Sequence, residues 1–233
     1  CEETIKIGIV AATAHPQVDY RKGNNSKFPY AKSPQEVINY VSCHDDYTLS
    51  DKLAFSMKDA TVSERKRAAR LAQTIVLTSQ GVPLISAGEE VFRDKKGVGN
   101  SYCSPDSINA IDWDLKTINN GQFEYYRELI ALRKAHPAFR MRSAGEIARN
   151  IVFDNTGIPN LISYSILNNA NDDDWKEIKV VFNGNSEDVS IDIQEYKWTV
   201  IACDGKIRAT GLGLSNGGKM TAARISALIL ARE

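Results

Sequence analysis

The chain has 233 residues, 42% of them hydrophobic, and its 29 basic and 29 acidic side chains give a formal net charge of zero. This composition predicts a globular protein with a substantial core, and it excludes the long-range field by which a protein attracts nucleic acid or an anionic membrane. No apolar run approaches the roughly 18–20 residues of a membrane span. We therefore expect a ligand that is close to neutral, such as a sugar, and the compartment stays undefined.

The first 33 residues combine one apolar run with a long polar stretch. The run Thr4–Val10 is rich in β-branched residues and predicts a short strand. The polar, turn-rich residues that follow, as far as Pro29, are typical of an irregular segment over a binding face.

A second apolar run, Val37–Val41, ends within three residues at an adjacent imidazole and carboxylate, His44 and Asp45. Its composition predicts a strand that is buried on both faces. In a parallel α/β barrel the carboxyl end of each strand faces the active site, so a substrate would meet His44 and Asp45 there. Taken alone, the pair is also compatible with a structural role in a solvated loop.

The next segment has the pattern of a βαβ unit. Thr61-Val-Ser-Glu64 forms a capping box ahead of an amphipathic helix that Gly81 closes. A short apolar strand follows from Val82 and runs to Glu89 and Glu90. Adjacent residues of a strand point to opposite faces, so these two carboxylates are expected to be structural, with Arg93 or Lys95 as partners.

The last part of the chain changes from helical to strand-like patterning. Helical periodicity over residues 122–136 stops at Pro137. From Ser143 onward, short β-branched runs separated by Asn-Gly and Asp-Gly turns predict an antiparallel β-sandwich, with Trp198 in its core. The strands are expected at 150–153, 161–167, 178–182, 189–193, 198–202 and 223–230.

The sequence gives little support for a metal site or a cofactor. Its four cysteines, at positions 1, 43, 103 and 203, are far apart and form no C-x-x-C pair. The cluster Asn168-Asn-Ala-Asn-Asp-Asp-Asp174 is expected to be a polar loop, with a weak calcium site left open there as a minority alternative.

Several motifs, in one order along the chain, carry a resemblance to a known family. They are Asn39-Tyr-Val-Ser-Cys-His-Asp45, Gly81-x-Pro83 with Gly88-x-Glu90, Asp94-Lys-Lys-Gly97, Asn100-Ser-Tyr102, Pro105-Asp106 and Ile111-Asp-Trp113. Together with the helix that ends at Pro137 and the β-sandwich, they resemble the α-amylase superfamily of glycoside hydrolases, and within it type I pullulanases. The resemblance covers nearly all of residues 1–142, whereas the β-sandwich is similar mainly in position and type.

The resemblance implies roles for five residues. Asp45 looks like the third catalytic carboxylate, which stabilises the oxocarbenium-like transition state, and His44 looks like its companion, which binds sugar hydroxyls. Asn100, Ser101 and Tyr102 fall in the loop where pullulanases contact neighbouring sugars. Asp46 departs from the family, in which Asn is common after the catalytic Asp, and this changes the electrostatics expected of the pocket.

The resemblance also implies what this chain does not supply. In the superfamily the nucleophilic Asp and the general-acid Glu come from earlier barrel strands, and a retaining hydrolase needs both. We therefore expect residues 1–142 to be the C-terminal segment of a (β/α)8 barrel, strands 7 and 8 with their helices, and residues 143–233 to be the β-sandwich. The expected function is part of a retaining debranching hydrolase of α-1,6 linkages in pullulan and branched α-glucans, inactive alone and without cofactor.

An alternative is a noncatalytic carbohydrate-binding or interaction module that acts through the β-sandwich. In either case α-glucan is the expected partner. Open barrel edges are expected to favour self-association of the chain.

Overall fold

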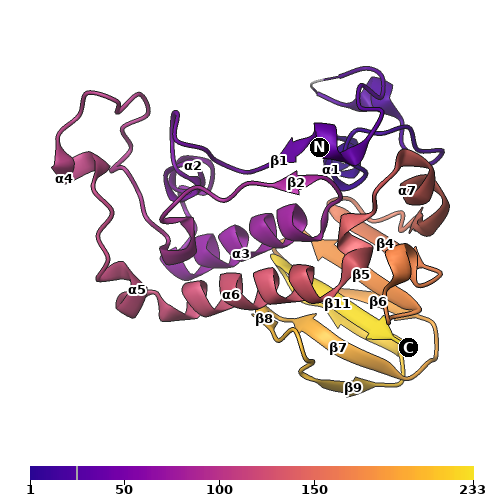
Figure 1. Ribbon diagram of the computed structural model, residues 1–233. Helices are drawn as coiled ribbons and strands as arrows, with labels where there is room; N and C mark the ends of the chain where they lie inside the picture. The colour runs from indigo at the N-terminus through magenta and orange to yellow at the C-terminus, as the bar shows by residue number, and fades with distance from the viewer. Residues whose placement is uncertain (25) are drawn as a thin grey trace.

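The computed structural model describes residues 1–24 and 26–233. Helices lie against one face of a large, mostly antiparallel sheet, and a lobe that carries α4 projects away from this body (Figure 1). The mixed helix and antiparallel sheet architecture predicted from the sequence is therefore confirmed. None of the helices within the described residues is long and apolar enough to cross a membrane.

The elements have the following bounds. The α-helices are α1 (Glu2–Ile9), α2 (Leu49–Ser56), α3 (Val62–Thr78), α4 (Asp106–Asn109), α5 (Leu115–Ile118), α6 (Asn120–Ala135) and α7 (Ala144–Asn150). The 3₁₀ turns are η1 (Tyr20–Lys22), η2 (Pro34–Glu36), η3 (Glu89–Val91), η4 (Pro137–Arg140) and η5 (Ala170–Asp172). The strands are β1 (Ile38–Asn39), β2 (Val82–Pro83), β3 (Ile151–Phe153), β4 (Leu161–Leu167), β5 (Glu177–Asn183), β6 (Val189–Ile193), β7 (Trp198–Cys203), β8 (Lys206–Ile207), β9 (Gly213–Ser215), β10 (Gly218–Ala222) and β11 (Ser226–Arg232).

The main sheet has seven strands in the order β3-β4-β5-β11-β7-β8, with β9 also paired to β7. One face packs on the helices, because alternate residues of β4 and β5, such as Tyr164 and Val180, join the largest hydrophobic cluster. The other face packs on the two-stranded ribbon β6–β10 through a second cluster around Trp198. The predicted antiparallel sandwich is thus confirmed in outline, and Trp198 is buried as expected.

The first apolar run does not form the predicted strand. Residues Glu2–Ile9 form α1, in which Lys6 pairs with Glu3 one turn away and Ile9 is fully buried in the main cluster. β-branched residues favour strands only weakly, and packing against the core overrides this preference.

The βαβ unit is present, with differences from the prediction. β1 and β2 pair in parallel, Ile38 beside Val82, and α3 lies between them in the chain with the capping box of Thr61 and Glu64. The same connection contains α2, which was not predicted although Thr48 and Asp51 form a second capping box.

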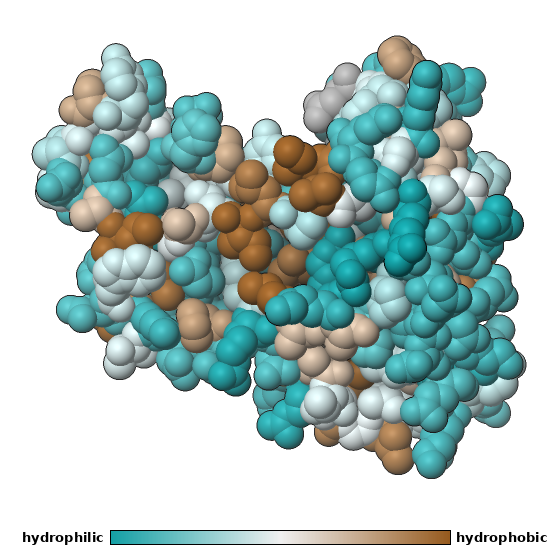
Figure 2. Space-filling model, in the orientation of Figure 1, coloured by the Kyte–Doolittle hydropathy of each residue, from teal (hydrophilic) through white to brown (hydrophobic). Residues whose placement is uncertain are grey.

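One face of this parallel pair is open, so the prediction of a strand buried on both faces is wrong. Val37 is buried, whereas Ile38 of β1 and Tyr40 just after it are more than half exposed, and Val82 of β2 and Leu84 just after it are also exposed. Brown apolar atoms gather in the middle of Figure 2, where β1 and β2 lie in Figure 1. A two-stranded sheet has no further strand to cover this face.

Arg133 of α6 fixes the turn that leads from α3 into β2. Its guanidinium donates to the carbonyls of Leu77, Ser79 and Gly81 at 2.7–2.9 Å, and it is buried. These bonds satisfy carbonyl groups at the end of α3, which the helix leaves without partners, and in the turn that follows it. The second strand of the pair is thereby held at a defined position against α6.

Candidate functional site

The turn after β1 presents the two residues that the sequence singles out. His44 Nε2 lies 3.4 Å from Asp45 Oδ1, and the two side chains are 90% and 82% exposed. Asp46 follows in the left-handed region with φ of 60°, a conformation that Asp tolerates better than most residues. The turn therefore places an imidazole and a carboxylate together in solvent at the carboxyl end of a parallel strand.

A buried hydrogen-bond network holds the residues just before this turn. Ser42 Oγ and Gln73 Nε2 each donate to the carboxyl group of Glu89, in contacts shorter than usual. Ser42 lies two residues before His44, Glu89 begins η3 after β2, and Gln73 belongs to α3. The network thus joins the ends of both parallel strands to the helix between them.

Glu89 is buried and hydrogen-bonded within the protein, and its partners differ from those predicted. The ion pairs expected with Arg93 or Lys95 do not occur among the described residues. Arg93 donates to Asn109 O, and Lys95 Nζ donates to Gly99 O. Glu90 instead accepts a hydrogen bond from the Gly88 amide at 2.9 Å.

Burial makes Glu89 titrate near neutral pH. Its side chain loses hydration, and this raises the pKa of its carboxyl to about 7. The hydrogen bonds from Ser42 and Gln73 lower the pKa in part. The charge of Glu90 raises the pKa further, and the charge of Lys52 lowers it. Between the ordinary pKa of 4.5 and this value, the folded chain binds more protons than the unfolded chain. The contribution of Glu89 to the stability of the folded chain is fully present below pH 4.5 and is lost as the pH rises through 7.

We expect Glu89→Gln to remove this pH dependence. The neutral amide can accept from Gln73 and donate to the Ser42 hydroxyl, so the network can persist without a buried charge. In urea titrations, the unfolding free energy of the variant minus that of the unmodified chain should rise by about 2–3 kcal/mol as the pH increases from 5 to 8. Glu64→Gln, at the exposed capping box of α3, is the control and should show no such gain. Equal pH dependence of Glu89→Gln and the unmodified chain would contradict the assignment.

Asp51 of α2 ties the long loop after η3 to the candidate site. Its carboxylate accepts from the amides of Lys95 and Gly97, at 3.0 and 2.8 Å, and also from the Thr48 hydroxyl at 2.7 Å. Asp51 is 3% exposed. The loop consequently lies against the turn, where a Cβ added to Gly99 would approach Asp46 Oδ1 to 2.8 Å.

The three predicted sugar-contact residues follow directly in this loop, but they differ in exposure. Tyr102 is 85% exposed and Asn100 is also exposed, whereas Ser101 is buried and its carbonyl accepts from Asn109 Nδ2 at 2.6 Å. Asn100 and Tyr102 are thus free to contact a ligand, while Ser101 holds the loop together.

Asp173, in the polar loop of residues 168–174, contacts the end of α6. Asp173 accepts from the amides of Ala138 and Trp175 and pairs with His136 Nδ1 at 3.0 Å. The described residues contain no group of three or more His, Cys, Asp or Glu side chains that could hold a metal ion. Asp173 therefore joins the sandwich to the end of α6.

Known proteins with similar sequences are pullulanases and an isoamylase of Flavobacterium sp, the latter 28% identical over 159 residues. Residues 147–206 match the family model "Pullulanase, all-beta domain". The pullulanase of Bacillus subtilis (strain 168) is 43% identical over 161 residues, which are 69% of this chain and 22% of that protein.

Solved structures of the same kind cover nearly the whole chain. Type I pullulanase from Bacillus subtilis str. 168, complexed with maltose, superposes with a TM-score of 0.87 at 33% identity over 98% of this chain and 30% of its own. Pullulanase from Paenibacillus barengoltzii, in complex with maltohexaose and α-cyclodextrin, gives 0.83 at 33% identity over 99% of this chain and 34% of its own.

The chain is therefore homologous to glycoside hydrolases of the pullulanase class. Pullulanases, a type I enzyme among them, predominate among its relatives, so the resemblance predicted from the sequence motifs is confirmed. The chain spans between 13% and 34% of the length of the proteins it matches. These relatives do not favour the alternative of an autonomous binding module.

Proposed function

We propose that this chain forms one part of a debranching glycoside hydrolase that cleaves α-1,6 linkages in pullulan and branched α-glucans. The observation that carries the proposal is the exposed His44–Asp45 turn at the carboxyl end of a parallel strand, anchored by the buried network around Glu89. Active sites of (β/α)8 barrels lie at this end of the strands. Residues 1–142 are then the last part of such a barrel, and residues 143–233 are its C-terminal sandwich.

Asp45 and His44 divide the chemistry between charge and hydroxyl binding. Cleavage of a glycosidic bond builds positive charge on the sugar ring, and a fixed anion near the ring is preorganised to stabilise it. Asp45 supplies that anion without attacking the ring. The His44 imidazole, beside it, binds hydroxyls of the sugar at the cleavage point, through contacts that strengthen in the transition state.

The loop of Asn100, Ser101 and Tyr102 holds the neighbouring sugars. The exposed Tyr102 ring offers a flat apolar surface, and the Asn100 amide offers both a donor and an acceptor for hydroxyl groups. The Asp51 bonds to Lys95 and Gly97 hold this loop beside the His44 turn.

The retaining mechanism that we propose requires two further carboxyl groups about 5 Å apart, a nucleophile and a general acid. We assign both to barrel strands outside this chain. The open face of Ile38, Tyr40, Val82 and Leu84 is where the remaining barrel would pack.

In the isolated chain the same open face should drive self-association. Sedimentation velocity should detect oligomers of the unmodified chain, and the double substitution Ile38→Ser with Val82→Ser should abolish them.

Linkage specificity tests the proposal. The full-length protein that contains this chain should release reducing ends from pullulan and should leave linear amylose, which has only α-1,4 linkages, nearly untouched. Comparable cleavage of amylose would replace debranching by an amylase activity. No hydrolysis of either glucan by a folded full-length protein would contradict the proposed function.

A further inference from the structure

A polar cleft lies on the sandwich, on the sheet face that the ribbon β6–β10 covers only in part. The ribbon packs over Leu161, Val181 and Trp198 and leaves the β3–β4–β5 end of that face open. The resulting cavity has a volume of about 680 Å³, within the size range of small-ligand sites. None of its lining residues belongs to the His44 turn or to the loop of residues 94–102.

The floor of the cleft is polar, although it is recessed. Ser163, Ser165 and Glu177 point into it from β4 and β5, and each is less than 9% exposed. Ser163 donates to Asp154, and Ser165 Oγ lies 3.1 Å from Glu177 Oε1. Recessed hydroxyl and carboxyl groups of this kind are fixed in orientation before a ligand arrives.

The charges in the cleft largely neutralise one another. Lys179 pairs with Asp154, and Arg232 pairs with Glu177 at 2.8 Å, while the Tyr196 ring lies against the Arg232 guanidinium at 4.1 Å. Opposite charges held in pairs give no net attraction for an ion, but they leave free donor and acceptor positions. Among the described residues, no hydrogen bond uses Arg232 Nη1. A neutral ligand with many hydroxyl groups fits this pattern best.

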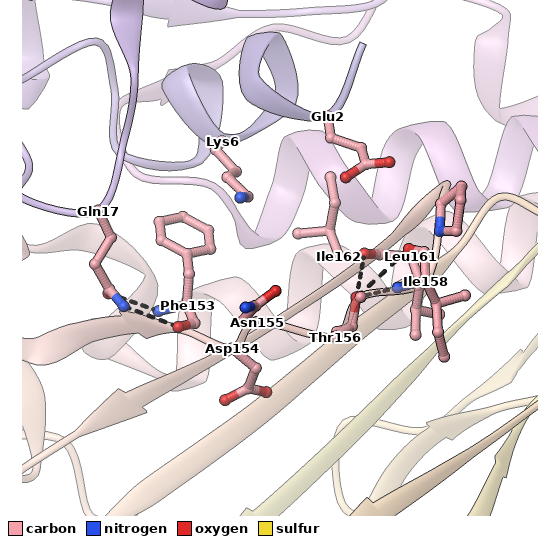
Figure 3. A pocket seen from close by; sticks show the side chains of 12 residues that line it. Glu2, Lys6, Gln17, Phe153, Asp154, Asn155, Thr156, Ile158, Leu161 and Ile162 are labelled. Carbon is pink, nitrogen blue, oxygen red and sulfur yellow. Dashed lines mark hydrogen bonds between the residues drawn. The ribbon is translucent and has the colours of Figure 1, made fainter.

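The loop between β3 and β4 extends the cleft toward α1. A second cavity of about 430 Å³ shares Asp154, Asn155 and Thr156 with the first, so this loop forms a common lip (Figure 3). Glu2 of α1 accepts from the Asn160 amide at 2.7 Å and fixes the lip. Two cavities on either side of one lip suit an extended chain molecule better than a single compact ligand.

We propose that this cleft is a second glucan-binding site, which holds a segment of a neutral α-glucan chain away from the His44–Asp45 turn. The identity of the glucan rests on the proposed function, whereas the cleft itself does not. Its Lys179 and Arg232 donate to sugar hydroxyls, and its Asp154 and Asp192 carboxylates accept from them. Such a site would hold a long substrate on the enzyme while a distant branch point is cut.

The test is an NMR titration of the ¹⁵N-labelled chain with maltohexaose. We expect amide shifts in residues 154–165 and 177–194 with a dissociation constant on the order of 1 mM. Lys179→Met, which removes an ammonium donor, should weaken binding about tenfold. Asn155→Ala, an exposed change that spares the fold, should also weaken it, and Lys176→Met, a nearby exposed lysine outside the cleft, should not.

Several outcomes would overturn the second site. They are no shifts at about 10 mM maltohexaose, shifts confined to residues 38–49 and 94–102, or equal affinity in all variants. Response to an extended peptide alone, along the unpaired edge of β6, would assign the cleft to protein docking and also overturn it. Pullulan hydrolysis by the full-length protein is scored separately. Binding in the cleft without hydrolysis would support the second site and contradict the proposed function. Hydrolysis without binding in the cleft would support the proposed function and contradict the second site.

Discussion

Asp45→Asn should lower pullulan hydrolysis by the full-length protein about 10²–10³-fold, the usual loss when one electrostatic contact to a transition state is removed. The change keeps the shape of the side chain and removes its charge. Because Asp45 is 82% exposed in the turn, the substitution should leave the unfolding free energy nearly unchanged. Initial rates of reducing-end release, measured at saturating and limiting pullulan, give kcat and kcat/KM separately, and both should fall.

The adjacent residue is a matched control for this prediction. Asp46→Asn removes the same charge one position along the chain, and Asn tolerates the left-handed backbone found there. We expect less than about a fivefold loss, since this charge is not assigned to the sugar ring. Equal losses for Asp45→Asn and Asp46→Asn would show that only the net charge of the turn matters, which would contradict the specific role of Asp45.

Asp51→Ala should cause the largest loss of stability among the substitutions considered. The change deletes the capping box of α2 and leaves the Lys95 and Gly97 amides without their acceptor, while Lys95 is only 4% exposed. A lost cap costs about 1 kcal/mol, and each buried donor left without a partner costs about 1–3 kcal/mol. Gly97 is exposed, so water can replace Asp51 at its amide, and the lost cap with the buried Lys95 amide predicts a fall of about 2–4 kcal/mol in unfolding free energy in urea titrations.

The second capping box of the chain provides the comparison. Glu64 accepts from the Thr61 amide at 2.8 Å in an exposed position and holds no distant loop. Glu64→Ala should cost only about 1 kcal/mol. Limited proteolysis adds a local readout, because Asp51→Ala should open the loop of residues 94–102 to cleavage and Glu64→Ala should not. Similar losses for both variants would show that Asp51 acts only as a helix cap.

Local signals in the sequence predicted most of the architecture. The turn dipeptides and β-branched runs after Ser143 located β3 to β7 and β11 to within three residues but missed α7 and β8 to β10, and the capping box at Thr61 located α3. Where a local pattern competed with packing, the prediction failed. The run Thr4–Val10 has strand-like composition, yet it lies as α1 on the hydrophobic cluster. The signal for α2, Thr48-x-x-Asp51, was present in the sequence and was not used.

For the candidate site as well, some residues could be predicted from the sequence and others could not. His44 and Asp45 could be predicted as candidates because they follow an apolar run and lie within a linked series of motifs. The supporting residues were not found, because Glu89 is joined to Ser42 and Gln73 over 47 and 16 positions. The link from Asp51 to Lys95 spans 44 positions. Single-sequence patterns carry no information about such long-range contacts, and the cleft on the sandwich likewise depends on how far the β6–β10 ribbon extends over the sheet.

The most direct test of the central claim compares pullulan hydrolysis by the full-length protein with hydrolysis by this 233-residue chain alone. If the chain contributes the His44–Asp45 turn to a site completed elsewhere, the full-length protein releases reducing ends and the folded chain releases none. Hydrolysis by the chain alone, abolished by Asp45→Asn, would show that it holds a complete active site and would contradict the account.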